Sequence, residues 1–104
     1  LKLETKQTTI MDFRLKVFYT VALRLNFTKA ATELYITQPA VSKHIQELEE
    51  TYKTKLFERN GSKITLTKAG EILLKHTKGI FEIYREIDFD MSTFINQRQG
   101  LLRL

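Results

Sequence analysis

The stretch NFTKAATELYITQPAVSKHIQELEE, residues 26–50, decides the fold of this chain. It carries the pattern of a short helix over residues 29–34 and of a longer helix that begins at Gln38 and runs on to Tyr52. Only three residues separate the two patterns, and the small side chains of Ala30 and Ala31 allow another helix to approach closely. Two helices joined by so short a turn predict a helix-turn-helix. The expected fold class is therefore mainly α.

The longer helix has a defined start and two distinct faces. Thr37 is a favourable N-cap, and Pro39 falls in the first helical turn, where its missing N–H costs nothing. Apolar spacings of four, three and four residues predict a buried stripe of Val41, Ile45, Leu48 and Tyr52. The opposite, outward stripe consists of Pro39, Lys43 and Gln46. His44 lies to one side and is expected to pack near the hairpin predicted below or near phosphates, with no metal role.

Acidic residues limit how much of this helix could approach a polyanion. Glu47, Glu49 and Glu50 are expected to form a solvated face that would repel phosphates. Only the first two turns of the helix are therefore expected to enter a groove of DNA.

Further elements are predicted on both sides. Asp12 can cap a preceding helix whose apolar rows are Phe13, Val17, Val21 and Phe18, Ala22, Leu25. Thr28 is expected to cap the short helix. Alternating runs at residues 56–59 and 63–66 flank Asn60-Gly61-Ser62, which predicts a β-hairpin. Thr67 is expected to cap a final helix from Lys68 to about Gln97.

These elements divide the chain into four segments. Residues 1–10 are polar without a period, and are expected to be a vector-derived leader or a disordered arm. Residues 11–66 are expected to form a winged helix-turn-helix, and residues 67–98 a long helix. Residues 99–104 contain Gly100-Leu-Leu-Arg-Leu and are expected to begin the first strand of a further domain.

Composition limits the classes of function. The chain has 104 residues, 42% hydrophobic and 28% charged, which predicts one soluble domain without a membrane span. It contains no cysteine and no catalytic motif, so neither an enzyme nor a metal or cofactor site is expected. The net charge is +5, but residues 11–66 hold nine Lys and Arg against six Asp and Glu, a balance of only +3. Charge alone is therefore a weak argument for a polyanionic partner.

Linked motifs resemble the DNA-binding domain of LysR-type transcriptional regulators. They are Phe-Thr-x-Ala-Ala, Thr-Gln-Pro-Ala-Val-Ser-Lys, Leu-Glu, Leu-Phe-x-Arg and Leu-Thr-x-Ala-Gly-Glu, and the resemblance runs from Met11 to about Gln97. It implies a winged helix-turn-helix, a linker helix that pairs two subunits antiparallel, and a C-terminal domain that binds a small-molecule effector. The implied function is a bacterial, cytoplasmic, nucleoid-associated regulator. Such a protein binds an inverted repeat in double-stranded DNA as a homodimer, with a tetramer left open for the intact protein.

The outward stripe and the resemblance together suggest the DNA contacts. Contacts in or at the edge of the major groove are expected from Gln38, Pro39, Ala40, Ser42, Lys43 and Gln46. Contacts to phosphates or the minor groove are expected from Thr28, Lys29, Thr37, Arg59, Ser62, Lys63 and Thr67. The alternative for Gln38 and Ser42 is that they satisfy backbone groups of the first helical turn. The alternative for Arg59 and Lys63 is an ordinary exposed charge.

The final helix carries a predicted dimerisation surface. Spacings of four and three residues connect Leu73, Thr77, Ile80, Tyr84, Ile87, Met91 and Phe94, a heptad pattern that we term the seam. The alternative is a helix that packs within its own chain. Additional apolar residues beside the seam exceed what one small domain covers, which favours a homodimer. Two rival functions stay open: another winged-helix family, and a protein-interaction module that never contacts DNA.

Three positions depart from the resembled family. Glycine is common where this chain has Leu25 and Lys53. If the backbone at Lys53 is left-handed, the lysine costs about 1 kcal/mol. Lys43 stands where arginine is frequent, and lysine lacks the bidentate fork that discriminates between bases.

Overall fold

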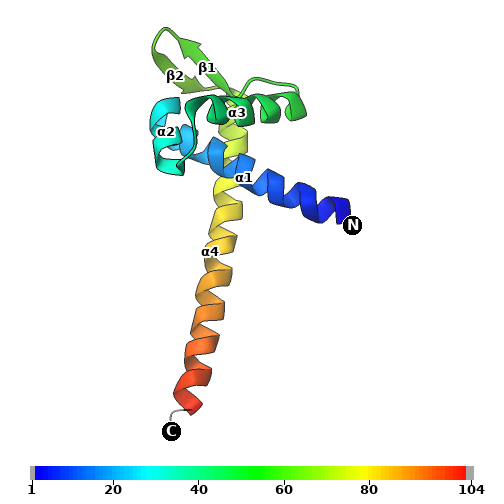
Figure 1. Ribbon diagram of the computed structural model, residues 1–104, viewed down its shortest axis with the longest axis vertical. Helices are drawn as coiled ribbons and strands as arrows, with labels where there is room; N and C mark the ends of the chain where they lie inside the picture. The colour runs from blue at the N-terminus through cyan, green and yellow to red at the C-terminus, as the bar shows by residue number, and fades with distance from the viewer. Residues whose placement is uncertain (1, 103–104) are drawn as a thin grey trace.

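The computed structural model describes the backbone of residues 2–102 and the side chains of residues 13–98. Its elements are α1 (Lys2–Arg24), α2 (Phe27–Leu34), α3 (Gln38–Tyr52), β1 (Phe57–Asn60), β2 (Lys63–Leu66) and α4 (Lys68–Leu102). Helices α2 and α3, the hairpin and the second half of α1 gather at one end of α4, and we call this part the head (Figure 1). Most of α4 extends away from the head, and the molecule measures 63 × 32 × 25 Å. The prediction of a mainly α winged helix-turn-helix is confirmed.

Helix α1 contributes one side of the core of the head. Four residues of its two predicted apolar rows are buried: Val17, Phe18, Val21 and Ala22. Phe13 and Leu25 lie at the ends of those rows and are 39% and 43% exposed. Leu15, which the two rows did not include, is buried. The rows therefore predicted the centre of the buried face and not its edges.

Helix α3 contributes the opposite side of the core. Val41, Ile45 and Leu48 are buried as predicted. The prediction that Tyr52 is buried is wrong, because its side chain is 47% exposed. Tyr52 lies in the last turn of α3, where its ring lines an open groove instead of entering the core.

The N-cap of α2 corrects a prediction. Asn26 caps this helix, and its Oδ1 accepts a hydrogen bond from the Lys29 N–H at 2.8 Å. Thr28 is therefore not the cap and lies within the first turn. Asparagine is at least as good a cap as threonine, and Asn26 has the extended backbone (φ −158°) that a cap needs. Thr37 caps α3 as predicted, since its hydroxyl accepts from the Ala40 N–H at 3.2 Å.

Three helices end in residues with left-handed backbone. The φ angles are 50° at Leu25, 58° at Tyr35 and 55° at Lys53. The backbone at Lys53 is thus left-handed, which is the condition under which the lysine at this position is expected to be strained. Leu25 has the same conformation. Tyr35 was not anticipated. It closes α2, where its N–H donates to the Thr32 carbonyl at 3.3 Å, and it begins the short turn into α3.

The predicted hairpin is present and joins closely to α4. Strands β1 and β2 pair antiparallel, with Asn60 opposite Lys63 and Gly61 in the turn at φ 64°. Thr67 caps α4 as predicted, because its hydroxyl accepts from the Gly70 N–H at 3.0 Å. A Cβ on Gly70 would lie 2.2 Å from the Leu56 carbonyl oxygen, so only glycine allows α4 to start this close to the base of the wing.

Both ends of the chain differ from the sequence expectations. Helix α1 begins at Lys2, so Asp12 lies inside a helix and is not its cap. Residues 2–11 contain no proline or glycine to end a helix, so the helix extends through them although they show no apolar period. Helix α4 continues to Leu102, so the expectation of a strand from Gly100 is wrong for residues 100–102. A helix satisfies its backbone hydrogen bonds within itself, whereas a strand needs a neighbouring strand. The rest of that expected strand, Arg103 and Leu104, lies outside the described residues.

Candidate nucleic-acid interface

The first two turns of α3 present a polar surface. Gln38, Pro39, Lys43 and Gln46 are exposed, and Ala40 and Ser42 are half-buried. Gln38 Nε2 donates a hydrogen bond to Ser42 Oγ at 3.2 Å, which links the start of the helix to its second turn. Four of the six side chains predicted to contact bases are thus exposed near the start of α3. The alternative that the Gln38 and Ser42 side chains satisfy backbone groups is not borne out, because among residues 13–98 they bond each other and not the backbone.

The N-terminal ends of α2 and α3 carry the predicted phosphate contacts. Thr28 and Lys29 are exposed in the first turn of α2, and Thr37 is exposed before α3. The Thr37 hydroxyl accepts a bond from Ala40, and its own proton has no acceptor among the described residues. A helix N-terminus favours an anion because its first N–H groups lack partners within the helix. These positions are therefore chemically suited to phosphate.

The wing, formed by the β1–β2 hairpin, places a cation beside α3. Arg59, on β1, is exposed, and its Cζ lies 4.4 Å from the centroid of the Phe27 ring. Ser62 and Lys63 are exposed where the hairpin turns. A depression of about 480 Å³ separates the wing from α3 and is lined by Ser42, Gln46, Glu49, Lys55 and Arg59, among others.

Thr67 behaves differently from the other predicted contacts. Its hydroxyl donates to the Lys55 carbonyl at 2.7 Å while it accepts from Gly70. A phosphate oxygen can only accept, and the one proton of this hydroxyl already has an acceptor. The geometry places Thr67 as a joint between the wing and α4.

The three glutamates of α3 are not one solvated face, which corrects that expectation. Glu47 Oε1 lies 3.2 Å from Arg14 Nε and 3.6 Å from His44 Nδ1. Glu49 is nearly buried, and its Oε2 accepts from the Leu56 N–H at 2.9 Å. Of the three, Glu50 alone is classed as exposed. In the sequence, the one signal that set Glu49 apart from Glu47 and Glu50 was its place in the Leu-Glu motif at residues 48–49.

His44 lies against α1, and the expectation that it packs near the wing is wrong. Its ring meets the Phe13 ring edge-on, with centroids 5.1 Å apart. Together with Arg14 and Glu47 it joins α3 to α1, on the side of α3 away from the wing. The reason is tertiary, because α1 supplies both the aromatic ring and the cation that flank these α3 residues.

The seam on α4 divides into two parts. Leu73 and Ile80 are half-buried, and Thr77 is fully buried with its hydroxyl donating to the Leu73 carbonyl at 2.7 Å. Beyond them, Tyr84, Ile87, Met91 and Phe94 are 40–53% exposed. The packing of α4 on its own α1, seen also in the Tyr19–Phe81 ring contact at 5.3 Å, accounts for the first part. The prediction that Thr77 contributes to the dimerisation surface is therefore wrong, since its side chain offers no surface to a partner.

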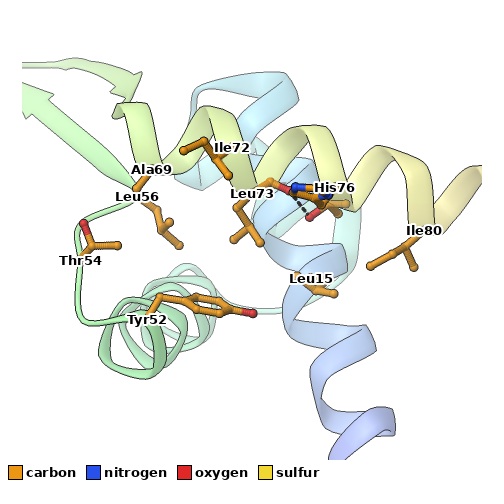
Figure 2. A pocket seen from close by; sticks show the side chains of 10 residues that line it. Leu15, Tyr52, Thr54, Leu56, Ala69, Ile72, Leu73, His76 and Ile80 are labelled. Carbon is orange, nitrogen blue, oxygen red and sulfur yellow. Dashed lines mark hydrogen bonds between the residues drawn. The ribbon is translucent and has the colours of Figure 1, made fainter.

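An apolar groove lies where the seam meets the head. It has a volume of about 440 Å³, and α1, α3, α4 and the loop before β1 all contribute to it. Figure 2 shows Leu73 and Ile80 of α4 on one side, with Leu15 of α1 and Tyr52 of α3 facing them. The exposed part of the seam continues outward from this groove through Ile80.

In the part of the chain with described side chains, no helix is long and apolar enough to cross a membrane. The same residues contain no cluster of three or more potential metal ligands.

The chain is similar to proteins with known roles. Residues 13–71 match the family described as "Bacterial regulatory helix-turn-helix protein, lysR family". The HTH-type transcriptional regulator CbbR of Rhodospirillum rubrum is 40% identical over 91 residues, which are 88% of this chain and 30% of that protein. This chain thus spans about 30% of the length of such curated relatives.

Solved structures agree with that similarity. A crystal structure of a LysR-family transcriptional regulator from Eggerthella lenta is 48% identical, with a TM-score of 0.62, and the match covers 64% of this chain and 96% of that one. The DNA-binding domain of BenM in complex with catB site 1 DNA is 28% identical, with a TM-score of 0.74. That match covers 79% of this chain and 91% of that one. CbbR and two further curated relatives carry the names of transcriptional regulators.

Proposed function

Because this chain belongs to the LysR family of bacterial helix-turn-helix regulators, we propose that it binds double-stranded DNA sequence-specifically, as a homodimer that contacts an inverted repeat. The observation that carries the proposal is one shared surface. Ser42 and Gln46 of α3 and Arg59 of the wing line the same depression between α3 and the wing. A helix that fits the major groove and a hairpin that reaches the adjacent backbone complete this mode of binding.

One group of residues contacts the bases of the DNA, and a second group contacts its backbone or minor groove. Gln38, Pro39, Ala40, Lys43 and Gln46 face the base edges, where amide and ammonium groups discriminate by hydrogen bonds. Thr28, Lys29, Thr37, Arg59, Ser62 and Lys63 fix the position of α3 through phosphates or the minor groove, and Ser42 lies in the major groove or at its edge. Thr67 is left out because the only donor of its side chain, the hydroxyl, already donates to the Lys55 carbonyl.

Helix α4 supplies the dimer contact in this proposal. Its exposed apolar residues, besides those of the seam, include Ile83, Phe89 and Ile95. A continuous apolar stripe of this length on a projecting helix favours burial against a partner. An inverted repeat then follows from the two-fold symmetry of the pair.

The charges of α4 favour an antiparallel pair. Residues 68–78 carry three lysines and one glutamate, a net charge of +2 with His neutral. Residues 82–98 carry four acidic residues and two arginines, a net charge of −2. Antiparallel pairing brings the basic half of each helix beside the acidic half of the other, whereas parallel pairing places like charges together.

A binding selection tests the proposal. The chain is incubated with a randomised duplex library at near-physiological salt, bound duplexes are sequenced, and the mass of the chain in solution is measured by sedimentation. Enrichment of an interrupted inverted repeat by a dimer is expected. Binding without a shared sequence would contradict specificity and leave only the electrostatic attraction that every duplex offers. Absence of binding would favour a protein-interaction module. Cytoplasmic location and an effector-binding domain beyond this chain stay predictions.

A further inference from the structure

The Arg59 side chain is held without using its hydrogen-bond donors. Its Cζ lies 4.4 Å from the centre of the Phe27 ring, within the range of a cation–π contact. Among residues 13–98 no hydrogen bond and no ion pair involves this guanidinium. An aromatic face attracts a cation through its quadrupole and takes up no N–H group in a conventional hydrogen bond. The five donors of Arg59 thus stay available while its position is restricted.

The ring that holds Arg59 is itself fixed by the core. Phe27 is 6% exposed and directly follows the Asn26 cap, so its backbone is set by the start of α2. Its ring meets the Phe57 ring at 5.9 Å, and Phe57 in turn meets Phe18 at 5.4 Å. Phe57 and Arg59 are two apart on β1 and therefore share one face of the strand. The face that buries Phe57 against Phe27 also carries Arg59 over the same ring.

The restricted guanidinium borders the proposed DNA surface. Arg59, Ser42 and Gln46 line the depression between the wing and α3, and Phe27 forms part of its wall. Glu49 lines it too, but its carboxylate accepts from the Leu56 N–H and lies 3.7 Å from Lys55 Nζ. An arginine with free planar donors at this place matches the geometry of a phosphate oxygen pair.

We propose that Phe27 is a positioning residue for DNA binding, because it holds the Arg59 guanidinium at the edge of the depression, with its donors free for a backbone phosphate. This inference rests on the proposed function and adds to it a residue that does not itself contact DNA. Without the ring, the flexible arginine chain samples many rotamers and must be ordered at the moment of binding. Phe27 removes part of that cost beforehand.

The first test is a double-mutant cycle. Affinity for a fluorescent mixed-sequence duplex of 40 base pairs is measured by anisotropy at 100 mM KCl for the unmodified chain, Phe27→Leu, Arg59→Ala and the double variant. Phe27→Leu is expected to weaken binding roughly three- to tenfold when Arg59 is present, the size of one cation–π contact. In the Arg59→Ala background the same change is expected to have no further effect. Far-UV circular dichroism verifies that each variant is folded.

Phe18→Leu is the matched control. Phe18 packs on the same Phe57 ring and is fully buried, but no cation among the side chains of residues 13–98 lies over it. Its effect on affinity is expected to be equal with and without Arg59, as for a change that acts only through packing. If Phe27→Leu does not fold, residue 27 is replaced by phenylalanine with one, two or three ring fluorines, which weakens the quadrupole with little change of shape. Affinity is then expected to fall stepwise with each fluorine.

The outcomes separate this inference from the proposed function. An equal effect of Phe27→Leu in both backgrounds, or affinity that is flat across the fluorinated series, overturns the positioning role and leaves DNA binding intact. Unchanged affinity in Arg59→Ala overturns the inference together with the role of Arg59. Failure of the unmodified chain to bind the duplex overturns the proposed function and the inference with it.

Discussion

Replacing Lys53 with glycine is expected to stabilise the chain. Lys53 ends α3 in the left-handed region, with φ 55° and ψ 40°, and its N–H donates to the Glu49 carbonyl. A side chain with a Cβ costs about 1–2 kcal/mol in this conformation, because the Cβ approaches the following carbonyl oxygen. Glycine removes that penalty, and the side chain of Lys53 is exposed, so no packing is lost.

The net gain is smaller than the penalty. Glycine makes the unfolded chain more flexible, which offsets about 0.4–1 kcal/mol of the gain. About 0.5–1 kcal/mol of extra stability remains. For a domain of this size that corresponds to a rise in Tm of about 3–6 °C.

The assay is thermal unfolding followed by circular dichroism at one fixed chain concentration, because association alters Tm. Lys53→Ala is the matched control, since it removes the same charge and stem but retains the Cβ. Its Tm is expected to equal that of the unmodified chain or to fall slightly, through loss of a cation near the C-terminus of a helix. If glycine and alanine shift Tm equally, the left-handed backbone is not the source of strain and the reasoning is refuted.

Three further predictions concern the wing, the dimer and the recognition surface. Glu49→Ala leaves the Leu56 N–H without its acceptor and is expected to lower the free energy of unfolding by about 1–3 kcal/mol, measured by urea titration. An equal loss of unfolding free energy in Glu50→Ala, which changes an exposed residue, would contradict the anchoring role of Glu49. Ile87→Asp places a charge on the exposed seam and is expected to convert the dimer to a monomer in sedimentation experiments. Ser92→Asp adds the same charge to the same half of α4 outside the seam and is expected to leave the dimer intact, and a dimer that persists in Ile87→Asp would exclude this face. Gln38→Ala is expected to relax base preference at one or two positions by about 1–3 kcal/mol each in a binding selection, and an unchanged preference would remove Gln38 from the base contacts.

Local signals in the sequence predicted most of the secondary structure. The caps Thr37 and Thr67 bond N–H groups three residues ahead, and the hairpin depends on the Asn60-Gly61 turn. Such interactions involve neighbours within a few residues, so they can be recognised without knowing the fold. Where local signals competed, as between Asn26 and Thr28 for the cap of α2, the sequence left two acceptable answers and the weaker one was chosen.

The partners of charged and aromatic side chains could not be predicted in this way. Glu47 was assigned to solvent, yet Arg14 lies beside it from a helix more than 30 residues earlier in the chain. His44 was expected to pack near the wing or near phosphates, yet its ring contacts Phe13 on α1. A period of 3.6 residues shows which residues share a helix face, but not which neighbouring helix that face meets.

Local patterns and motifs at fixed spacing were enough to predict the helix-turn-helix, the wing, the outward residues of α3 and the membership of the LysR family. Three features became apparent only from the packing of the folded chain: Glu49 anchors the loop before the wing, Phe27 lies under Arg59, and the seam of α4 is buried at Thr77 and exposed beyond Ile80. The last two depend on segments that are distant in the chain and meet only when the core of α1, α2 and α3 has formed, and the first depends on the loop after α3 turning back toward that helix. The physical reason is that burial and pairing are properties of the space between elements, whereas periodicity and capping are properties of one element alone.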